Sequence, residues 1–177
     1  QKTGFFLDQR ENRKLLARYA QDREVLNAFS YSGAFSVYAL SGKAKSVTSL
    51  DSSKPALELA TQNVVLNFEN ANHKTVASDC MDYLLQAKEQ YDMIVLDPPA
   101  FAKNQSSLEN ALRAYRRINH QAIKNIRRGG IVFTFSCSQH VSKENFREMV
   151  FSASTETTRS VKVLYQLEQG PDHPISI

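Results

Sequence analysis

The stretch Val25-Leu26-Asn27-Ala28-Phe29-Ser30-Tyr31-Ser32-Gly33-Ala34-Phe35-Ser36-Val37-Tyr38-Ala39-Leu40 decides the fold of this chain. It predicts a short apolar strand, a tight loop that ends at Gly33, and a helix that begins directly after the glycine. Where a buried strand feeds a helix through small residues, free backbone N–H groups at the start of the helix form a crevice for a ligand. The loop lacks the G-x-G-x-x-G pattern of a dinucleotide site, so a cofactor without phosphates fits it better.

An acidic residue follows the next predicted strand, about twenty residues further along the chain. The run Ser46-Val47-Thr48-Ser49-Leu50 ends at Asp51, where a carboxylate can accept hydrogen bonds from a pair of ribose hydroxyls. The order of strand, glycine loop, helix, strand and acid points to S-adenosylmethionine (SAM). An acid at a strand end is also an ordinary helix N-cap, and the sequence leaves this second interpretation of Asp51 open.

Length and composition limit the classes of protein to which the chain can belong. Its 177 residues, 42% of them hydrophobic, are enough for one domain with its own core. The formal net charge of +4 modestly favours a polyanionic partner. No run approaches the roughly 18 apolar residues of a membrane span, and no apolar segment of a signal peptide opens the chain. We therefore expect a piece of a longer cytoplasmic protein that has no membrane contact.

Cysteine usage excludes two further kinds of site. Cys80 and Cys137 are too few for a disulfide framework, and no paired Cys/His spacing is typical of zinc. The sequence therefore predicts two free thiols and no metal.

Helices and strands alternate along the rest of the chain. Asp8 is a candidate N-cap for a helix over 9–19, Ser52 or Ser53 for one that ends near Asn67, and Ser142 for one over 143–154. Gly129-Gly130 is typical of a helix C-cap. The predicted elements are a short apolar segment at 4–7, further helices at 81–89 and 108–128, and further strands at 74–78, 91–96, 131–135 and 161–165.

This alternation predicts an α/β fold, a Rossmann-like parallel sheet with helices on both faces. Right-handed crossovers place the carboxyl ends of all parallel strands at one edge of the sheet. The loop at 29–33, Asp51, Asp79, Asp97 and Cys137 each follow a predicted strand, so we expect them to converge there. Two prolines after Asp97 fix its backbone and exclude the start of a helix.

The chain resembles the class I SAM-dependent methyltransferases, and specifically the bacterial large-subunit (23S) rRNA cytosine-C5 methyltransferases of the RlmI type. The resemblance implies that residues 1–177 form the catalytic domain, with a short strand and helix at 4–19 and a core at 24–168. An RNA-binding PUA domain and a final strand of the sheet are expected to lie outside this chain. The matching segments are Gly4-Phe5-Phe6-Leu7-Asp8-Gln9-Arg10, Leu26 to Gly33, Asp51, Asp97-Pro98-Pro99-Ala100-Phe101, Thr134-Phe135-Ser136-Cys137-Ser138 and Asp172-His173-Pro174.

The resemblance also implies the roles of individual residues. In that family the glycine loop holds the methionine end of SAM, the acid that matches Asp51 binds the ribose, and the acid that matches Asp79 reads the adenine amino group. The expected cofactor-binding residues are Gln9, Arg10, Phe29, Ser30, Tyr31, Ser32, Gly33, Asp51, Ser52, Asp79, Cys80 and Asp97.

Methylation of cytosine at C5 requires a nucleophile on the enzyme. A thiolate that adds to C6 turns the ring into an enamine whose C5 can attack the methyl group, and Cys137 is the candidate for this step. Asp97 is the candidate acid near N3. The target base has to leave its stack, so we expect single-stranded or loop rRNA as the substrate. Pro98, Pro99, Phe101 and Tyr115 are the expected substrate contacts, with the two aromatic rings stacked on the base.

Several alternatives stay open at this stage. An rRNA guanine-nitrogen methyltransferase or an adenine-N6 enzyme would share the Asp-Pro-Pro loop without needing a thiol, and a non-catalytic RNA-binding subunit would share the fold. A homodimer is a further alternative. Cys80 is interpreted as a buried core thiol. Basic residues on two predicted helices belong either to a solvated face or to a contact with a ligand or RNA: Arg10, Arg13, Lys14, Arg18, Arg113, Arg116, Arg117, Lys124, Arg127 and Arg128.

Overall fold

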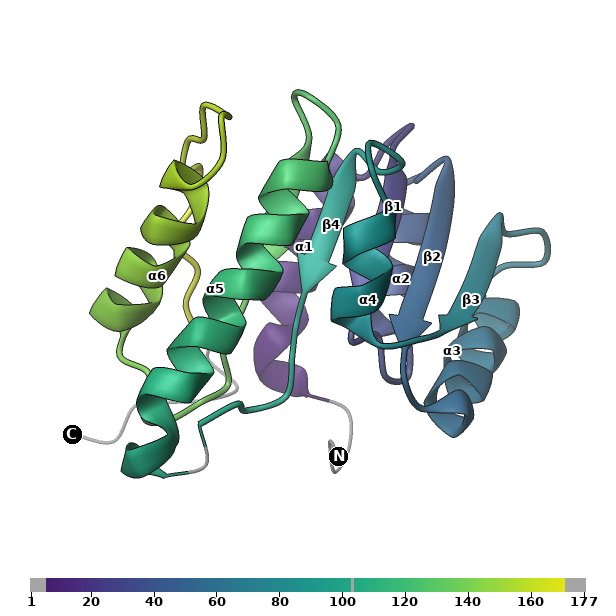
Figure 1. Ribbon diagram of the computed structural model, residues 1–177. Coiled ribbons are helices and arrows are strands. Elements are labelled where there is room, and N and C mark those ends of the chain that lie inside the picture. Colours follow the sequence, from purple (N-terminus) through teal and green to yellow (C-terminus); the bar gives the residue numbers. More distant parts are fainter. Residues whose placement is uncertain (1–5, 103, 171–177) are drawn as a thin grey trace.

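A computed structural model of the chain describes residues 6–102 and 104–170. It contains a five-stranded parallel sheet whose strands lie in the order β3-β2-β1-β4-β5 (Figure 1). This arrangement confirms the predicted α/β, Rossmann-like class. The strands are β1 (Glu24–Ala28), β2 (Ser46–Asp51), β3 (His73–Ala77), β4 (Met93–Leu96) and β5 (Ile131–Thr134).

Helices cover both faces of the sheet, as predicted. Behind the sheet in Figure 1 lie α1 (Arg10–Tyr19), α2 (Ala34–Ser41) and α3 (Lys54–Asn67). In front of it lie α4 (Cys80–Gln86) and α5 (Leu108–Asn125), and α6 (Lys143–Thr155) packs against α5. A hydrophobic core lies on each face of the sheet, and successive residues of β1 point into opposite cores. Val25 packs behind the sheet with Phe35, and Leu26 packs in front with Leu84. Burial on both faces explains why β4 is a continuous apolar run.

Two predicted helix caps, at Ser53 and Ser142, are confirmed by side-chain hydrogen bonds, and a third cap, at Asp79, was not predicted. Ser53 Oγ accepts from Ala56 N at the start of α3, and Ser142 Oγ accepts from Asn145 N at the start of α6. Asp79 accepts from two backbone N–H groups at the start of α4. Each cap satisfies backbone donors that the first turn of a helix leaves without a partner.

The prediction for the N-terminal segment is wrong in two respects. Leu7–Gln9 form a short 3₁₀ helix, η1, and Gln9 rather than Asp8 precedes α1, without a capping side chain. Phe6 and Leu7 are exposed and belong to no strand, whereas Gly4 and Phe5 lie outside the described residues. Asp8 lies inside the additional 3₁₀ turn instead of at the start of α1. Such turns are frequent at helix ends.

Two helices on the front face end earlier than predicted. α4 ends at Gln86, and α5 ends at Asn125 instead of running on to a C-cap at Gly129-Gly130. The next residue, Ile126, is extended and buried in the front core, and this burial takes the chain off the helix axis. Gly129, with a φ of +75°, instead forms the turn that leads into β5.

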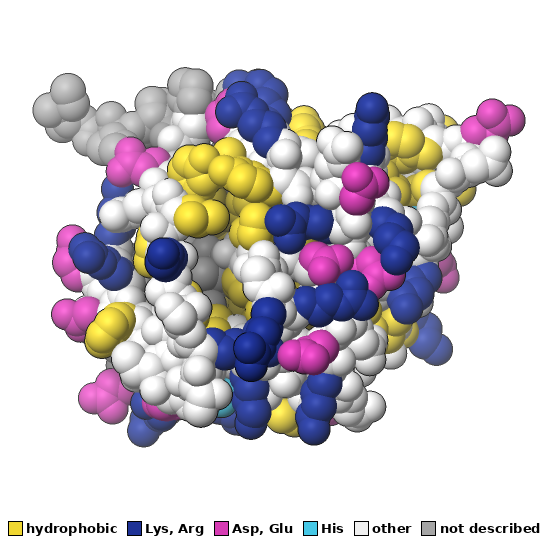
Figure 2. Space-filling view, turned by 90° about the horizontal axis from the view of Figure 1, so that it is seen from above, with side chains coloured by type: hydrophobic (Ala, Val, Ile, Leu, Met, Phe, Trp, Pro, Cys, Tyr) yellow, Lys and Arg dark blue, Asp and Glu magenta, His cyan; other side chains and the backbone are white. Residues whose placement is uncertain are grey.

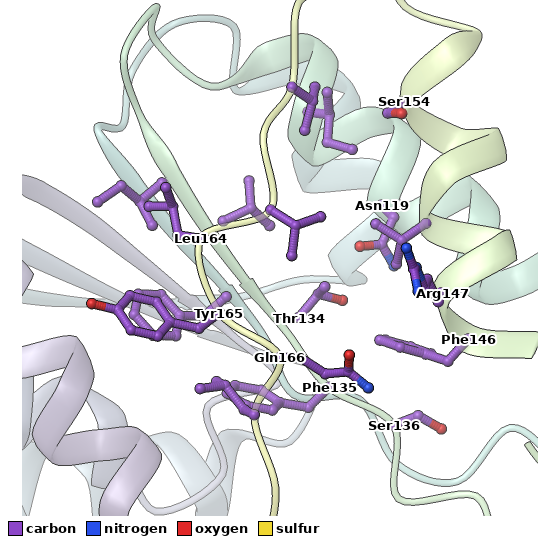
Figure 3. Close-up of a pocket in the computed structure, with 18 of the residues that line it drawn as sticks. Asn119, Thr134, Phe135, Ser136, Phe146, Arg147, Ser154, Leu164, Tyr165 and Gln166 are labelled. Atoms are coloured by element: carbon purple, nitrogen blue, oxygen red, sulfur yellow. The ribbon is translucent and has the colours of Figure 1, made fainter. Parts of the chain in front are cut away.

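The predicted strand at 161–165 is wrong. These residues belong to no strand, and four of them, Val161, Val163, Leu164 and Tyr165, are exposed hydrophobic side chains. The segment runs beside β5 but is separated from it by a hollow of about 2090 Å³ that also opens toward α6 (Figures 2 and 3). Tyr165 Oη lies 2.7 Å from Tyr19 Oη of α1, and Glu168 pairs with Lys143 of α6 at 2.7 Å. The segment is thus held by helices on either side of the hollow, away from the edge of the sheet.

Candidate functional site

The carboxyl ends of the strands meet at the lower edge of the sheet in Figure 1. Ala28 of β1 is in register with Leu50 of β2 and with Leu96 of β4. The next residues, Phe29, Asp51 and Asp97, therefore leave the sheet side by side. The strand order reverses between β1 and β4, and ligands of open parallel sheets bind at such a switch point. The predicted convergence is confirmed.

The loop after β1 has a backbone that few residues tolerate. Phe29, Tyr31 and Gly33 have positive φ angles of 59°, 47° and 78°. A Cβ on Gly33 would lie 2.8 Å from Ala60 Cβ of α3, so glycine is required there for space as well as for conformation. Strain of this kind costs on the order of 1–3 kcal/mol per residue and gathers at functional sites.

Asp51 holds this loop in place. Its Oδ2 accepts a hydrogen bond from Tyr31 N at 2.9 Å, and its Oδ1 accepts one from Ser53 N at 2.9 Å. Each carboxylate oxygen can accept a second bond, so the two backbone bonds leave capacity for the hydroxyls of a ribose. Asp51 is not the N-cap of α3, which is Ser53. Its carboxylate instead organises the loop after β1, and the ribose contact stays a prediction.

Asp79 combines a structural contact with room for a ligand in the same way. Its Oδ1 accepts from Met81 N at 2.7 Å and from Asp82 N at 3.1 Å, and these are its bonds within the described part of the chain. Its side chain is exposed, as is Ser52 beside Asp51. Asp51, Asp79 and Asp97 would repel a pyrophosphate, whereas SAM carries a positive sulfonium and an ammonium group. The edge therefore fits a cofactor of the predicted type.

Two other predicted cofactor residues, Ser30 and Cys80, have buried side chains. The side chain of Ser30 is buried, and within the described residues its Oγ has no hydrogen-bond partner. Cys80 is also buried, and burial raises the pKa of its thiol to about 12, although a bond to the backbone of Phe29 opposes the shift. The interpretation of Cys80 as a core thiol is confirmed.

The loop after β4 carries Asp97 and the predicted substrate contacts. Pro98 is buried and Pro99 is exposed, so of the two rings only that of Pro99 faces solvent. Phe101 is half-buried, and its ring lies 6.4 Å from that of Phe29, edge to face. This contact joins the loops after β1 and β4. The predicted substrate contact of Pro98 stays a prediction, although the residue is buried in this structure.

Cys137 lies on the loop after β5, next to the β4 loop. It is exposed, and its Sγ donates a hydrogen bond to the carbonyl oxygen of Pro98 across 3.6 Å. Ser136 and Ser138 flank it, and both of their hydroxyls bond to the hydroxyl of Tyr115 on α5. Tyr115 is fully buried beneath Phe101, with the two ring centroids 4.6 Å apart. The predicted stacking of Tyr115 on a base is therefore wrong, because no face of this ring is accessible.

The start of α1 also lies at this edge and carries the predicted cofactor residues Gln9 and Arg10 (Figure 1). Gln9 Oε1 accepts from Asn12 Nδ2 at 2.7 Å, and Arg10 pairs with Glu11 at 3.4 Å. Both side chains are half-buried. The structure thus places these two residues near the site.

The predicted solvated position of Arg13 is wrong, because this side chain is buried close to the candidate site. It is only 2% exposed, donates to the Phe6 carbonyl at 2.8 Å and lies over the ring of Tyr38. Burial lowers the pKa of Arg13, and the charges of Asp8 and Asp97 oppose that shift. A buried cation thus lies close enough to Asp97 to interact with it. The signal was helical spacing, because Arg13 shares a face with Leu16 and Ala20, both fully buried.

The basic residues of α5 and the turn after it divide into different environments. Arg127 pairs with Glu24 at 2.6 Å and with Asp92 at 3.2 Å, at the amino ends of β1 and β4. Figure 2 looks onto this end of the molecule, opposite the candidate site, and shows Lys and Arg side chains interspersed with Asp and Glu. Arg116 pairs with Glu156 at 3.2 Å. Arg127 thus stabilises the amino end of the sheet, far from Cys137.

Two searches of residues 6–102 and 104–170 concern metals and membranes. No group of three or more His, Cys, Asp or Glu side chains in this part of the chain could hold a metal ion. No helix within the same residues is long and apolar enough to cross a membrane.

The two cysteines are expected to differ strongly in reactivity, because the thiolate is the form that attacks an alkylating agent. At pH 8, a thiol with a pKa of about 12 is only about 0.01% ionised, and Cys80 is buried as well. Iodoacetamide should therefore label Cys137 in the native protein and both cysteines in guanidinium, as read by peptide mass spectrometry. Equal labelling of both thiols in the native protein would contradict the burial of Cys80.

Comparisons with known proteins agree with this geometry. The family model described as S-adenosylmethionine-dependent methyltransferase matches residues 1–176. The chain is 45% identical to "Ribosomal RNA large subunit methyltransferase I" of Alteromonas mediterranea, over 98% of this chain and 45% of that protein. It is 46% identical to "Ribosomal RNA large subunit methyltransferase" of Deinococcus radiodurans, over 99% of this chain and 44% of that protein. The chain thus spans somewhat less than half the length of these relatives.

Solved structures give the same result for the fold. A crystal structure of a methyltransferase complexed with SAH superposes with a TM-score of 0.83 and 28% identity, over 100% of this chain and 47% of that one. A SAM-dependent methyltransferase from Streptococcus mutans superposes with a TM-score of 0.84 and 28% identity, over 97% of this chain and 45% of that one.

Proposed function

The chain belongs to the family of SAM-dependent methyltransferases, and from this premise we propose that it is the catalytic part of an enzyme that methylates C5 of a cytosine in large-subunit rRNA. The names of the relatives support the rRNA substrate. One observation carries the choice of C5: an exposed cysteine, Cys137, lies at the end of β5 against the Pro98 carbonyl, beside Asp97. A ring nitrogen can attack a methyl group without such a thiol, whereas C5 of cytosine cannot.

Cys137 acts as the nucleophile in this proposal. Its thiolate adds to C6 and turns the C5–C6 double bond into an enamine. C5 of this enamine would take the methyl group from the sulfonium sulfur of bound SAM, which would leave as S-adenosylhomocysteine. The C5 proton is removed next, and the electron pair that it leaves expels the thiolate and restores the double bond. Cys80 cannot take this role, because it is buried and its thiol has a pKa of about 12.

Asp97 binds the target base at N3. Its strand, β4, neighbours β5, so the two loops start about 5 Å apart, a distance that suits contacts with C6 and N3 of one ring. A proton shared between the Asp97 carboxyl and N3 stabilises the charge that addition at C6 places on the ring. Arg13 beneath the loop supplies a compensating positive charge.

Residues at the carboxyl ends of β1, β2 and β3 would hold the cofactor in this proposal. SAM supplies the electrophilic methyl group. Asp51 accepts hydrogen bonds from the ribose, Asp79 from the adenine amino group, and the loop at 29–33 holds the methionine end. Gln9, Arg10, Ser52 and the backbone of Cys80 complete the site. The loop geometry supports this, since the two carboxylates already fix the surrounding backbone and do not need to reorganise on binding.

The RNA approaches from the side of Phe101 and Pro99. The half-buried Phe101 ring can stack on a base that has left its helix, and the exposed Pro99 lies at the rim. Such a base is most easily supplied by a single-stranded or loop region of the rRNA.

The identity of the methylated nucleoside tests this proposal. Large-subunit rRNA transcribed in vitro is incubated with the whole protein and SAM that carries a labelled methyl group, and the nucleosides of the digested RNA are separated by mass spectrometry. We expect label in 5-methylcytidine. Label in methylguanosine or methyladenosine would contradict the C5 assignment, and SAM binding without any transfer would favour a non-catalytic RNA-binding subunit.

A further inference from the structure

We propose that Tyr115 is a positioning residue for Cys137: its buried hydroxyl holds the two serines that flank the cysteine and so fixes the thiol relative to the loop after β4. This inference rests on the proposed function, because that function gives Cys137 its role. Tyr115 does not touch the substrate, since its side chain is fully buried.

The hydroxyl of Tyr115 belongs to a closed ring of hydrogen bonds. Ser136 Oγ donates to Tyr115 Oη at 3.0 Å, so the single proton of Tyr115 is left to donate to Ser138 Oγ, also at 3.0 Å. Ser138 N donates back to Ser136 Oγ at 3.3 Å. Cys137 lies between the two serines, so the hydrogen bond from Ser138 N to Ser136 Oγ spans its backbone. Each of the three hydroxyl oxygens accepts a hydrogen bond.

The same ring is tied to the neighbouring loop. Ala102 N, just beyond Phe101, donates to Ser138 Oγ at 3.2 Å, and Cys137 Sγ donates to the Pro98 carbonyl at 3.6 Å. The loop that carries Asp97 and the loop that carries Cys137 are therefore joined at both ends, and the Tyr115 hydroxyl is the group that both serines share.

The proposed reaction depends on the spacing between these two loops. Cys137 and Asp97 have to reach C6 and N3 of the same base, and a misplacement of about 1 Å can cost on the order of 100-fold in rate. Phenylalanine would fill the same space against Phe101 and Phe146. A buried hydroxyl is costly unless it is bonded, and here its bonds end on the neighbours of Cys137.

The variant Tyr115→Phe, compared with Tyr91→Phe, tests the inference in the whole protein. Tyr91 is the matched control: it is also buried, and its hydroxyl lies 2.6 Å from Tyr83 Oη and 3.2 Å from Thr48 Oγ1, at the amino end of β4. We expect Tyr115→Phe to lower kcat by about 10- to 100-fold, with KM for RNA and Kd for SAM changed by less than about twofold. Tyr91→Phe should leave kcat unchanged. Both variants lose one buried hydroxyl, so they should lower the melting temperature by similar amounts.

A second variant keeps the test independent of folding. Ser138→Ala opens the same ring without touching the aromatic packing, and it should lower kcat as Tyr115→Phe does. The double variant should be no worse than either single one, because both break one unit. A wild-type kcat in both single variants would overturn the inference, as would equal losses of kcat in Tyr115→Phe and Tyr91→Phe.

The variant Cys137→Ala, assayed in parallel, separates this inference from the proposed function. If Cys137→Ala is inactive and Tyr115→Phe is fully active, the positioning role alone is wrong. If Cys137→Ala is active, the proposed function is wrong, and the positioning role of Tyr115 is then wrong as well.

Discussion

Replacing Asp51 by alanine should weaken SAM binding by roughly 30-fold or more. The loss combines a charged hydrogen bond to the ribose, worth about 2 kcal/mol, with the loosening of the loop after β1. That loop depends on Asp51, because the carboxylate accepts from both Tyr31 N and Ser53 N. Isothermal titration of the wild type and the variant with SAM measures the change directly.

Two further variants define what Asp51 contributes. Asp51→Asn keeps one carbonyl acceptor but loses the charge, so its affinity should lie between those of the wild type and the alanine variant. Asp82→Ala, at an exposed acid in the first turn of α4, should bind SAM as the wild type does. Equal affinity of the wild type and Asp51→Ala would remove Asp51 from the cofactor site.

The sequence predicts the site well where local signals and topology act together. Asp51, Asp79 and Asp97 each lie at or just after the end of a strand, and parallel pairing then brings them to one edge whatever the details of packing. The register of Ala28 with Leu50 and Leu96 explains why the residues after these strands emerge side by side. The site could therefore be predicted from strand ends alone, without knowledge of any side-chain contact.

Tyr115 shows where such reasoning fails. An aromatic residue near a predicted RNA site is naturally taken as a stacking partner, but helical spacing places Tyr115 on the face that carries Ala111, Ile118 and Ala122. That face is the buried one. The helical periodicity alone therefore predicts that Tyr115 is buried. Its hydrogen bonds to Ser136 and Ser138 could not be predicted, because they depend on how α5 packs against the loop after β5.

The predicted strand at 161–165 is wrong for a different reason. Alternating residues predict a strand, but a strand also needs a partner edge, and sequence alone does not say whether that edge is within reach. Here Tyr165 bonds to Tyr19, and the segment stays apart from β5 (Figure 3). Local propensity was outweighed by tertiary contacts.

Replacing Cys137 by alanine should abolish methylation of RNA while leaving SAM affinity nearly unchanged, because the thiol serves the base and not the cofactor. The exposed position of Cys137 means that its loss removes little packing, so the variant should keep its melting temperature. Cys80→Ala is the control: it should retain activity, although the loss of a buried side chain lowers its stability.

The covalent intermediate itself is the most direct test of the account. RNA that carries 5-fluorocytidine at the target should accept the methyl group and then stall, because fluorine cannot leave C5 as a proton does. We expect a linked protein–RNA species that survives denaturing electrophoresis with the wild type and with Cys80→Ala, and that is absent with Cys137→Ala. Methylation of ordinary rRNA by Cys137→Ala at a near wild-type rate, with no linked species from any variant, would contradict the cytosine-C5 assignment and favour a guanine-nitrogen methyltransferase.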